Sequence, residues 1–508
     1  MNVHPSGPMG EMLFALQKAV TTSTITDLVK EDLEARAHSI LWKASSPTEL
    51  TLLKLCPSTE ARSIKHEFDK VDSYGEDRGY GFFGEQTLPL ETAPSFSRHQ
   101  TFIRLLGEMS STFLLASLES NLVSVDGQKT AESISRRTLM LNLLKKKNRA
   151  MYFSDTSKVR SGATAQRFQG LRQQIREGTD GTTGTSVYGS HEIDMEGQPL
   201  TAETLREKVA KIISLFGYAT TMVMDPFARA DFEASLDPAQ RLQIPAGIKP
   251  IIVGQNVGGI TTQGGQVMFH TDNGLTPLYA QGKYKGTAMQ GAPSRPSVTG
   301  GVASPGGSRT SKFNATDAGN YFWIVTEVKD ERESLGYRWP VSGTQAVAAG
   351  EEVTLTITPS DPYSDSFRVY RSISEDDAST DLYCIDEVAN SGSGAAVAHY
   401  DGNHERPGTS CAFLLSINSD SADDLNRAPG GTLSGYSTAA EKSEKYLGQE
   451  DREDNTVTMV NLGPAMGTMQ LATILATTAR PLLYSACAMQ VRNPFKNFVF
   501  KNVGSNYR

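Results

Sequence analysis

The sequence predicts an α+β protein into which a β-sandwich is inserted, and three patterns along its 508 residues support this fold class. Residues 130–153 space apolar side chains at intervals of three and four, as an amphipathic helix does. Residues 313–412 alternate apolar and polar side chains in short runs, which is the period of β-strands. Mixed helix and strand patterns precede and follow that stretch, so we expect one larger domain that the sandwich interrupts.

Composition restricts the class of protein. The formal net charge is −8 and 21% of the residues are charged, which argues against a protein that coats nucleic acid with its whole surface but leaves room for one basic face. The four cysteines are far apart and form no CxxC pair, so we expect reduced thiols. No run approaches the roughly 18 apolar residues of a membrane span, and the N-terminus lacks the pattern of a secretory signal. We therefore predict cytoplasmic folding and no membrane contact.

The chain carries no complete catalytic, cofactor or metal motif. Its eight histidines show neither HExxH nor HxH spacing, and GGVASPGG at 300–307 matches neither nucleotide-binding glycine pattern. GYSTA at 435–439 approaches GxSxG, but polar loop text surrounds it where a nucleophile elbow needs a strand and a helix. Asp401, Asn403 and Glu405 offer oxygen ligands to a cation, although a hairpin turn is the favoured interpretation. We predict no enzyme, no cofactor and no metal.

The first 107 residues predict an arm followed by an extended hairpin. Residues 1–60 form the N-terminal arm, with one amphipathic helix expected over 23–44. Residues 61–107 alternate polar and apolar side chains on either side of a centre rich in glycine and proline. Such a long projection has little core of its own, so we expect it to lie on a neighbouring copy, with Phe82 and Phe83 among the contacts.

The helix predicted over 130–153 is basic, since the charge balance from Thr130 to Asp155 is +4. We expect it to bury one stripe and to leave its cations outside. The expected stripe is Ile134, Thr138, Leu141, Leu144, Asn148 and Met151, flanked by Leu139 and Leu143. The candidate contacts with DNA phosphates, or with acidic residues of neighbouring copies such as those at 441–455, are Lys145, Lys146, Lys147 and Arg149. The alternative is an ordinary solvated helix face.

The body of the larger domain is predicted from residues 108–284 and completed by 413–508. Within the first range, TAETLREKVAKIISLFG at 201–217 predicts a helix with a capping box at its start. YATTMVMDP at 218–226 predicts a buried strand, and a second helix is expected from Pro226 onward. These elements make an α+β block.

A Gly/Pro/Ser-rich linker at 285–312 is expected to lead into the sandwich at 313–412. In EEVTLTITP we expect Val353, Leu355 and Ile357 to face inward and the threonines between them to face outward. The strand spacing fits a sandwich of the immunoglobulin or fibronectin type III kind, without the Cys, Trp, Cys pattern of a true immunoglobulin domain. Part of it is acidic, with eight Asp or Glu against two arginines between Asp361 and Glu387.

The order of these parts resembles the major capsid protein of tailed bacteriophages, which has the Hong Kong 97-type fold. The stretches that carry the resemblance are 61–107, 130–153, YFSDTSKVRSGATAQRFQGLRQQI at 152–175, TTMVMDPFARADFEASL at 220–236 and LLYSACAMQVRNPFKNFVFKNV at 482–503. The resemblance covers the chain outside 285–415, which is about three quarters of it. The motifs are patterns of order and spacing, because such capsid proteins share topology more than sequence.

The resemblance implies an E-loop at 61–107, a spine helix at 130–153 within peripheral and axial domains at 108–284, and completion of both by 413–508. It implies a chain that assembles into hexamers and pentamers of an icosahedral shell around double-stranded DNA. The partners it implies are copies of the chain, scaffolding and portal proteins and packaged DNA, in the virion capsid and, during assembly, the host cytoplasm. Immunoglobulin-like insertions recur on the outer surface in this family. One departure is the lack of an obvious long N-terminal scaffolding segment, which suggests a separate scaffold protein or mature numbering.

The alternative class is a phage tail or surface adhesion protein, in which the immunoglobulin-like sandwich is the binding module. That class predicts repeated sandwiches or a fibrous stalk, whereas this sequence has one sandwich and an α+β body. An enzyme with an accessory sandwich would need a convergent carboxylate or triad motif, which the sequence does not show.

Overall fold

The computed structural model describes residues 36–37, 48–73, 93, 95–110, 112–113, 124–125, 131–160, 167–177, 191–214, 219–236, 258–262, 265–373, 381–417, 456–470, 478–479 and 481–505. The chain divides into two compact units. Unit 1 comprises Met1–Leu41, Ser110–Thr138 and Leu471–Arg480, and unit 2 comprises Trp42–Met109, Leu139–Gln470 and Pro481–Arg508. Within the described ranges, no helix combines the length and the apolar character needed to cross a membrane.

Unit 1 contains two short strand pairs among its described residues. β1 (Arg36–Ala37) pairs in parallel with β7 (Ser124–Val125). β6 (Thr112–Phe113) pairs antiparallel with β25 (Thr478–Ala479). The helix expected over 23–44 lies outside the described residues, apart from the two residues of β1.

The longest helix, α4 (Ala131–Phe153), lies where the apolar period predicted a helix, but it buries a different face. Its buried side chains are Leu139, Leu143, Lys147, Asn148, Met151 and Tyr152. Thr138 is exposed, and Leu141 and Leu144 are half-buried, so the predicted stripe was wrong at these positions. The prediction placed all lysines of the helix on its exposed side. The buried row at positions 139, 143, 147 and 151 nevertheless includes Lys147.

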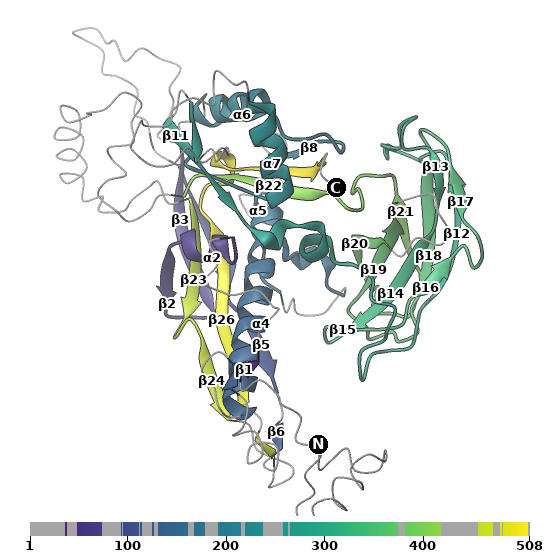
Figure 1. The fold of residues 1–508 in the computed structure, drawn as a ribbon, viewed down its shortest axis with the longest axis horizontal. Helices are drawn as coiled ribbons and strands as arrows, with labels where there is room; N and C mark the ends of the chain where they lie inside the picture. Colours follow the sequence, from purple (N-terminus) through teal and green to yellow (C-terminus); the bar gives the residue numbers. More distant parts are fainter. Residues whose placement is uncertain are drawn as a thin grey trace, which may run out of the picture. The chain divides into compact units, whose positions relative to one another are not determined.

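A five-stranded sheet packs against α4 in unit 2 (Figure 1). Its strands are β2 (Ser58–Ala61), β23 (Val457–Leu462), β26 (Pro481–Val491), β24 (Gly467–Gln470) and β5 (Arg104–Met109). The long strand β26 pairs antiparallel with β23, β24 and β5. Leu139 and Leu143 of α4 share a core cluster with Leu483 of β26, so one face of this sheet is covered by the helix.

The short helix α2 (Thr51–Leu55) precedes β2, and a two-stranded hairpin follows it. The hairpin consists of β3 (Lys65–Ser73) and β4 (Ser95–Phe102), which pair antiparallel from Lys65 opposite Phe102 to Ser73 opposite Ser95. Residues 74–92, including Phe82 and Phe83, lie outside the described residues.

A six-stranded sheet forms the second layer of unit 2. In sheet order its strands are β10 (Gly259–Thr262), β11 (Gly265–Thr271), β9 (Thr221–Met224), β22 (Ser410–Leu415), β27 (Phe498–Val503) and β8 (Glu192–Asp194). Helices α6 (Ala202–Ser214) and α7 (Pro226–Ser235) pack on one face, where Leu205 and Phe232 join the same apolar cluster as Met222 and Phe500. α5 (Leu171–Glu177) and the end of α4 pack on the other face, around Val223 and Phe413.

The predicted order of helix, strand and helix over 201–236 is confirmed. Thr201 caps α6, since its hydroxyl accepts from the Thr204 backbone N–H at 3.3 Å. β9 follows with all four side chains buried, and α7 begins at Pro226. Proline suits this first helical position because its fixed φ matches the helix and its missing N–H is not needed there.

Residues 297–401 form two facing antiparallel sheets with one apolar core (Figure 1). The first sheet is β12 (Ser297–Ala303), β18 (Glu352–Thr358) and β21 (Val397–Asp401). The second is β15 (Arg332–Glu333), β14 (Trp323–Lys329), β19 (Ser366–Ser372) and β20 (Leu382–Ala389), with β16 (Tyr337–Trp339) also on β14. β13 (Gly319–Tyr321) and β17 (Gln345–Val347) make a separate pair. Val353, Leu355 and Ile357 are fully buried, which confirms their inward direction; an immunoglobulin-like type stays a prediction.

The linker predicted at 285–312 was wrong over 297–303. β12 pairs with β18 along its whole length, from Ser297 opposite Thr358 to Ala303 opposite Glu352. The glycines of β12 led to the linker prediction. Gly300, however, is required for close packing and not for flexibility. A Cβ there would lie 2.8 Å from the Trp339 ring and 2.8 Å from the Thr354 carbonyl oxygen.

Candidate functional site

Lys147 is the one residue of the predicted basic contact set that lies inside the protein. Its side chain sits under β23 and β26, and its amine donates to Ser485 Oγ at 3.0 Å, Asn461 Oδ1 at 3.4 Å and the Ala465 carbonyl oxygen at 3.4 Å. Burial lowers the pKa of the Lys147 amine from its ordinary value. The expectation that this lysine faces outward was wrong, because three acceptors within the same chain satisfy its three N–H groups.

The other predicted basic contacts also have partners within the chain. Lys146 is exposed and forms an ion pair with Glu108 of β5. The Lys145 amine lies over the Tyr279 ring, 3.7 Å from its centroid. Arg149 donates to the Ala280 carbonyl oxygen at 3.3 Å. Contact of these three side chains with DNA or with a neighbouring copy stays a prediction, and the acidic segment at 441–455 lies outside the described residues.

A buried carboxylate, Asp272, connects three segments of the chain near the C-terminal end of α4. Its oxygens accept from the Thr51 backbone N–H at 3.0 Å, the Asn148 amide at 3.1 Å, the Tyr152 hydroxyl at 3.0 Å and the Gly274 backbone N–H at 2.7 Å. Burial, followed by the Asp272 charge and its hydrogen bond, raises the pKa of the Tyr152 hydroxyl well above its ordinary range. Sequence reasoning missed this cluster, because Asp272 lies more than a hundred residues from both Thr51 and the two α4 side chains.

The sheet that α4 covers on one face leaves apolar side chains uncovered on the other. The exposed fractions are 73% for Leu105, 53% for Met109 and 51% for Met469, whereas Leu106 of β5 packs in the cluster beside α4. The register aligns Met109, Leu482 and Met469 in one row across β5, β26 and β24. We call the residues Leu105, Met109, Met469, Leu482 and Tyr484 the outer sheet face.

Tyr484 occupies the next row of the outer sheet face, between two glycines. Gly107 lies opposite it on β5 and Gly467 opposite it on β24. A Cβ on Gly467 would lie 2.5 Å from the Tyr484 ring, so the ring rests on the glycine backbone. The aromatic ring and the methionine row are therefore adjacent, and together they form a continuous apolar surface.

The β3–β4 hairpin also exposes apolar side chains. On one of its faces, which we call the hairpin face, Phe96 is 66% exposed and Phe102 is 43% exposed. Ion pairs lie between them on the same face, where Arg98 contacts Asp69 at 2.8 Å and Glu67 at 3.9 Å. The opposite face is better covered and holds the Phe68 ring 5.6 Å from the buried His99. The predicted contacts Phe82 and Phe83 are outside the described part of this hairpin.

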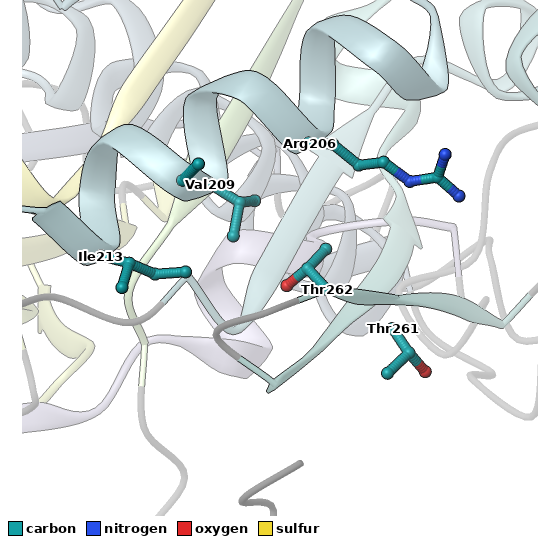
Figure 2. Close-up of a pocket in the computed structure, with 6 residues that line it drawn as sticks. Arg206, Val209, Ile213, Thr261 and Thr262 are labelled. Atoms are coloured by element: carbon teal, nitrogen blue, oxygen red, sulfur yellow. The ribbon is translucent and has the colours of Figure 1, made fainter.

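A small cavity of about 240 Å³ lies between α6 and the edge strand β10 (Figure 2). It is lined by Arg206, Val209, Ala210, Ile213, Thr261 and Thr262. In Figure 2 the Val209 and Ile213 side chains point from the helix toward the strand, and Arg206 extends away along the rim. The lining has one cation and no carboxylate, histidine or cysteine, so its residues supply no acid, base or nucleophile pair.

The carboxylates of DGNHERPG are engaged by cations of the protein itself. Asp401 accepts from Arg371 at 2.8 Å, and both side chains are buried. Glu405 accepts from Arg172 at 2.5 Å and from Lys501 at 3.3 Å. Among the described residues, no group of three or more His, Cys, Asp or Glu side chains is placed to hold a metal ion.

Comparison with known proteins gives likenesses of structure but not of sequence. No family model and no curated protein matches this chain. The capsid of a native GTA particle aligns with a TM-score of 0.41 at 8% identity, over 95% of this chain and 98% of that one. The capsid of cyanophage P-SCSP1u aligns with a TM-score of 0.41 at 9% identity, over 95% of both. The SrpI encapsulin of Synechococcus elongatus aligns with a TM-score of 0.38 at 8% identity, over 92% of both.

Proposed function

We propose that this chain is a structural subunit without enzymatic activity, and that it assembles with copies of itself into the icosahedral capsid of a tailed bacteriophage. The observation that carries the proposal is the presence of two uncovered apolar surfaces on one chain, the outer sheet face and the hairpin face. The order of parts in the sequence, which resembles Hong Kong 97-type capsid proteins, supports this kind of shell.

The outer sheet face favours a partner on physical grounds. Single exposed apolar side chains are common on protein surfaces and need no explanation. Here Met109, Leu482 and Met469 are neighbours across three strands, so the exposed area is contiguous. Contiguous apolar surface of this kind marks interaction sites, because covering it removes apolar area from water.

The arrangement offers two different surfaces for contact between copies. Phe96 and Leu105 are both exposed in the single chain, so the hairpin face does not cover the outer sheet face of its own copy. If the hairpin of one copy covers the sheet of the next, the contact joins two different surfaces. Such heterologous contacts close into rings when the rotation between copies fits, and hexamers and pentamers are rings of this kind.

The wider assembly belongs to the same proposal. Scaffolding and portal proteins are proposed partners during assembly in the host cytoplasm, and the mature location is the virion capsid. Packaged DNA is a proposed non-specific partner, because exposed cations such as Lys146 attract phosphates without reading sequence. The overall charge of −8 keeps this attraction modest.

Purification state tests the proposal. The full-length chain is expressed alone and with a co-expressed scaffold, and is examined by negative-stain electron microscopy and sedimentation velocity. Closed shells or five- and six-membered rings are expected. An elongated trimer would instead support the tail or adhesion class, and a particle that stays monomeric at every concentration tested, with and without scaffold, would overturn the proposal.

A further inference from the structure

The segment that joins α4 to α5 contacts the acidic edge of the sandwich. Lys158 donates to Asp386 of β20 at 2.8 Å. Arg167 forms a two-pronged contact with Glu387 of β20, with N–H donors 2.7 Å and 2.9 Å from the two carboxylate oxygens. Arg167 also reaches Glu331 at 3.2 Å. The acidic stretch between Asp361 and Glu387 is therefore partly neutralised by cations of the same chain.

The Arg167 contact is well shielded from water. The Arg167 and Glu387 side chains are each only 20% exposed. Burial acts to raise the pKa of Glu387, but the hydrogen bonds and charge of Arg167, together with the charge of Arg368, lower it to about 2. Two-pronged arginine–carboxylate pairs of this kind are both directional and stronger than a point-charge contact.

A second group of ion pairs holds the loop between β12 and β13. Lys312 contacts Asp194 of β8 at 2.6 Å. Arg406, which follows the last sandwich strand, contacts Asp317 of the same loop at 2.8 Å. Where the chain enters, Lys283 forms an isolated β-bridge with Tyr383 of β20. We call these three contacts the neck.

Apolar packing reaches the sandwich from outside where the chain enters it, since Tyr284 packs in a cluster with Tyr370 and Leu382. The core cluster of the sandwich is built from residues 298–397 alone, so the buried apolar side chains hold the two sheets to each other. Between β20 and the segment that contains Lys158 and Arg167, the described contacts are ionic. Salt screens exposed ion pairs more than shielded ones, so the Lys158–Asp386 pair is the more salt-sensitive of the two.

We propose that Lys158 and Arg167, with Asp386 and Glu387, form a releasable ionic clasp that fixes the orientation of the sandwich on the rest of unit 2. While the clasp is closed, the sandwich is held both at the neck and at the clasp. When the clasp opens, the sandwich keeps its own fold and turns about the neck. This inference concerns the single chain and does not depend on shell assembly.

Distance measurement by electron spin resonance on the unassembled full-length chain tests the clasp. Spin labels are placed at Val341→Cys in the sandwich and at Glu203→Cys in α6, both exposed positions. Cys384, which is the one partly exposed native cysteine, is replaced by alanine in every sample. At about 0.1 M salt, where charges are screened beyond about 10 Å, we expect one narrow distance distribution.

The variant pair decides the result. Lys158→Gln with Arg167→Gln should lose the single narrow distribution. The matched control is Lys329→Gln with Arg309→Gln, which breaks the pairs to Asp361 and Glu352 inside the sandwich and should keep it. Lys158→Gln alone should broaden the distribution partly, and it removes only one half-exposed pair, so it leaves folding intact. A narrow distribution in both clasp variants, or equal broadening in the control, would overturn the proposal.

Discussion

The amine of Lys147 donates to the hydroxyl of Ser485 at 3.0 Å, inside the protein and across the interface between α4 and β26. Together with Asn461 and the Ala465 carbonyl oxygen, Ser485 satisfies a cation that has no carboxylate among these bonded partners. The lysine therefore attaches the helix to the sheet. Its neighbour Lys146 points outward to Glu108, so two adjacent lysines of one triplet have different roles.

Replacing each lysine by alanine should have different effects on the free energy of unfolding. Lys147→Ala removes a donor from two buried acceptors, Asn461 Oδ1 and Ser485 Oγ, and should lower the free energy of unfolding by about 1–3 kcal/mol. Lys146→Ala removes an exposed ion pair and should change it by less than about 1 kcal/mol. Urea unfolding of both variants measures the difference. Equal effects would contradict the role assigned to Lys147.

His399 should make the sandwich sensitive to mild acid. Burial lowers the pKa of this histidine below its ordinary value, so the folded state binds fewer protons than the unfolded state near pH 6. Stability present above about pH 6.5 is therefore lost as the pH falls toward the folded pKa. The charged groups that face it are Asp386, Asp401, Lys158 and Arg371.

The matched variant for this test is His399→Gln, which cannot take up the proton. Thermal unfolding between about pH 7 and pH 5 should show a larger loss for the original protein than for His399→Gln. Parallel curves for the two proteins would mean that His399 does not contribute to the acid response.

The outer sheet face should be needed for assembly and not for folding. Leu105→Ser and Met469→Ser change side chains that are 73% and 51% exposed, so each should alter unfolding free energy by no more than about 0.5 kcal/mol. Together they should abolish rings and shells in sedimentation velocity. The control is Val341→Ser in the sandwich, where the side chain is 74% exposed. Normal shells from the double variant would refute the docking role of this face.

Strands β12 and β22 determine which segment can be deleted to remove the sandwich. A deletion of 313–412 would leave β12 without β18, and it would also remove Ser410, Cys411 and Ala412 from β22, which pairs with β9 and β27 in the six-stranded sheet. That deletion should give insoluble protein. Replacing 297–401 by a short Gly/Ser linker should instead spare the rest of the chain. Soluble yield and circular dichroism of the two deletions measure the contrast, and equal solubility would contradict these boundaries.

Local patterns predicted the elements of this fold better than their surroundings. The period of 131–153 identified α4, and alternation identified the inward side chains of β18. Both signals are carried by neighbouring residues. The burial of Lys147 depends on acceptors at 461–485, more than three hundred residues away, and no local rule places a lysine inward. β12 was not predicted because its glycines are typical of a linker. Gly300 is a glycine because the Trp339 ring leaves no space for a side chain there.

The candidate site shows the same division. The hairpin was predicted as a contact region from its length and its glycine-rich centre, whereas the outer sheet face was not predicted at all. Leu105 and Met109 alternate along β5 as they would in any half-buried strand. That their side, and not the side of Leu106, is uncovered depends on which face α4 occupies. Only the packed structure decides that.

Asp272 should be the most sensitive polar position near α4. Both of its oxygens accept, from the Thr51 and Gly274 backbone N–H groups and from the Asn148 and Tyr152 side chains. Asp272→Asn replaces one acceptor oxygen by a donor amide, which would then face donors. We expect a loss of about 1–3 kcal/mol for each backbone N–H left without an acceptor.

Tyr152→Phe gives the graded comparison, because it removes one donor and leaves the carboxylate with its other three. It should lower the free energy of unfolding by about 0.5–1.5 kcal/mol, less than Asp272→Asn does. Hydrogen exchange at the Thr51 amide should accelerate in Asp272→Asn and stay near its original rate in Tyr152→Phe. If Asp272→Asn unfolds at the same urea concentration as the original protein, then Asp272 does not join α2, α4 and the 272–274 turn energetically, and its four hydrogen bonds are replaceable by water.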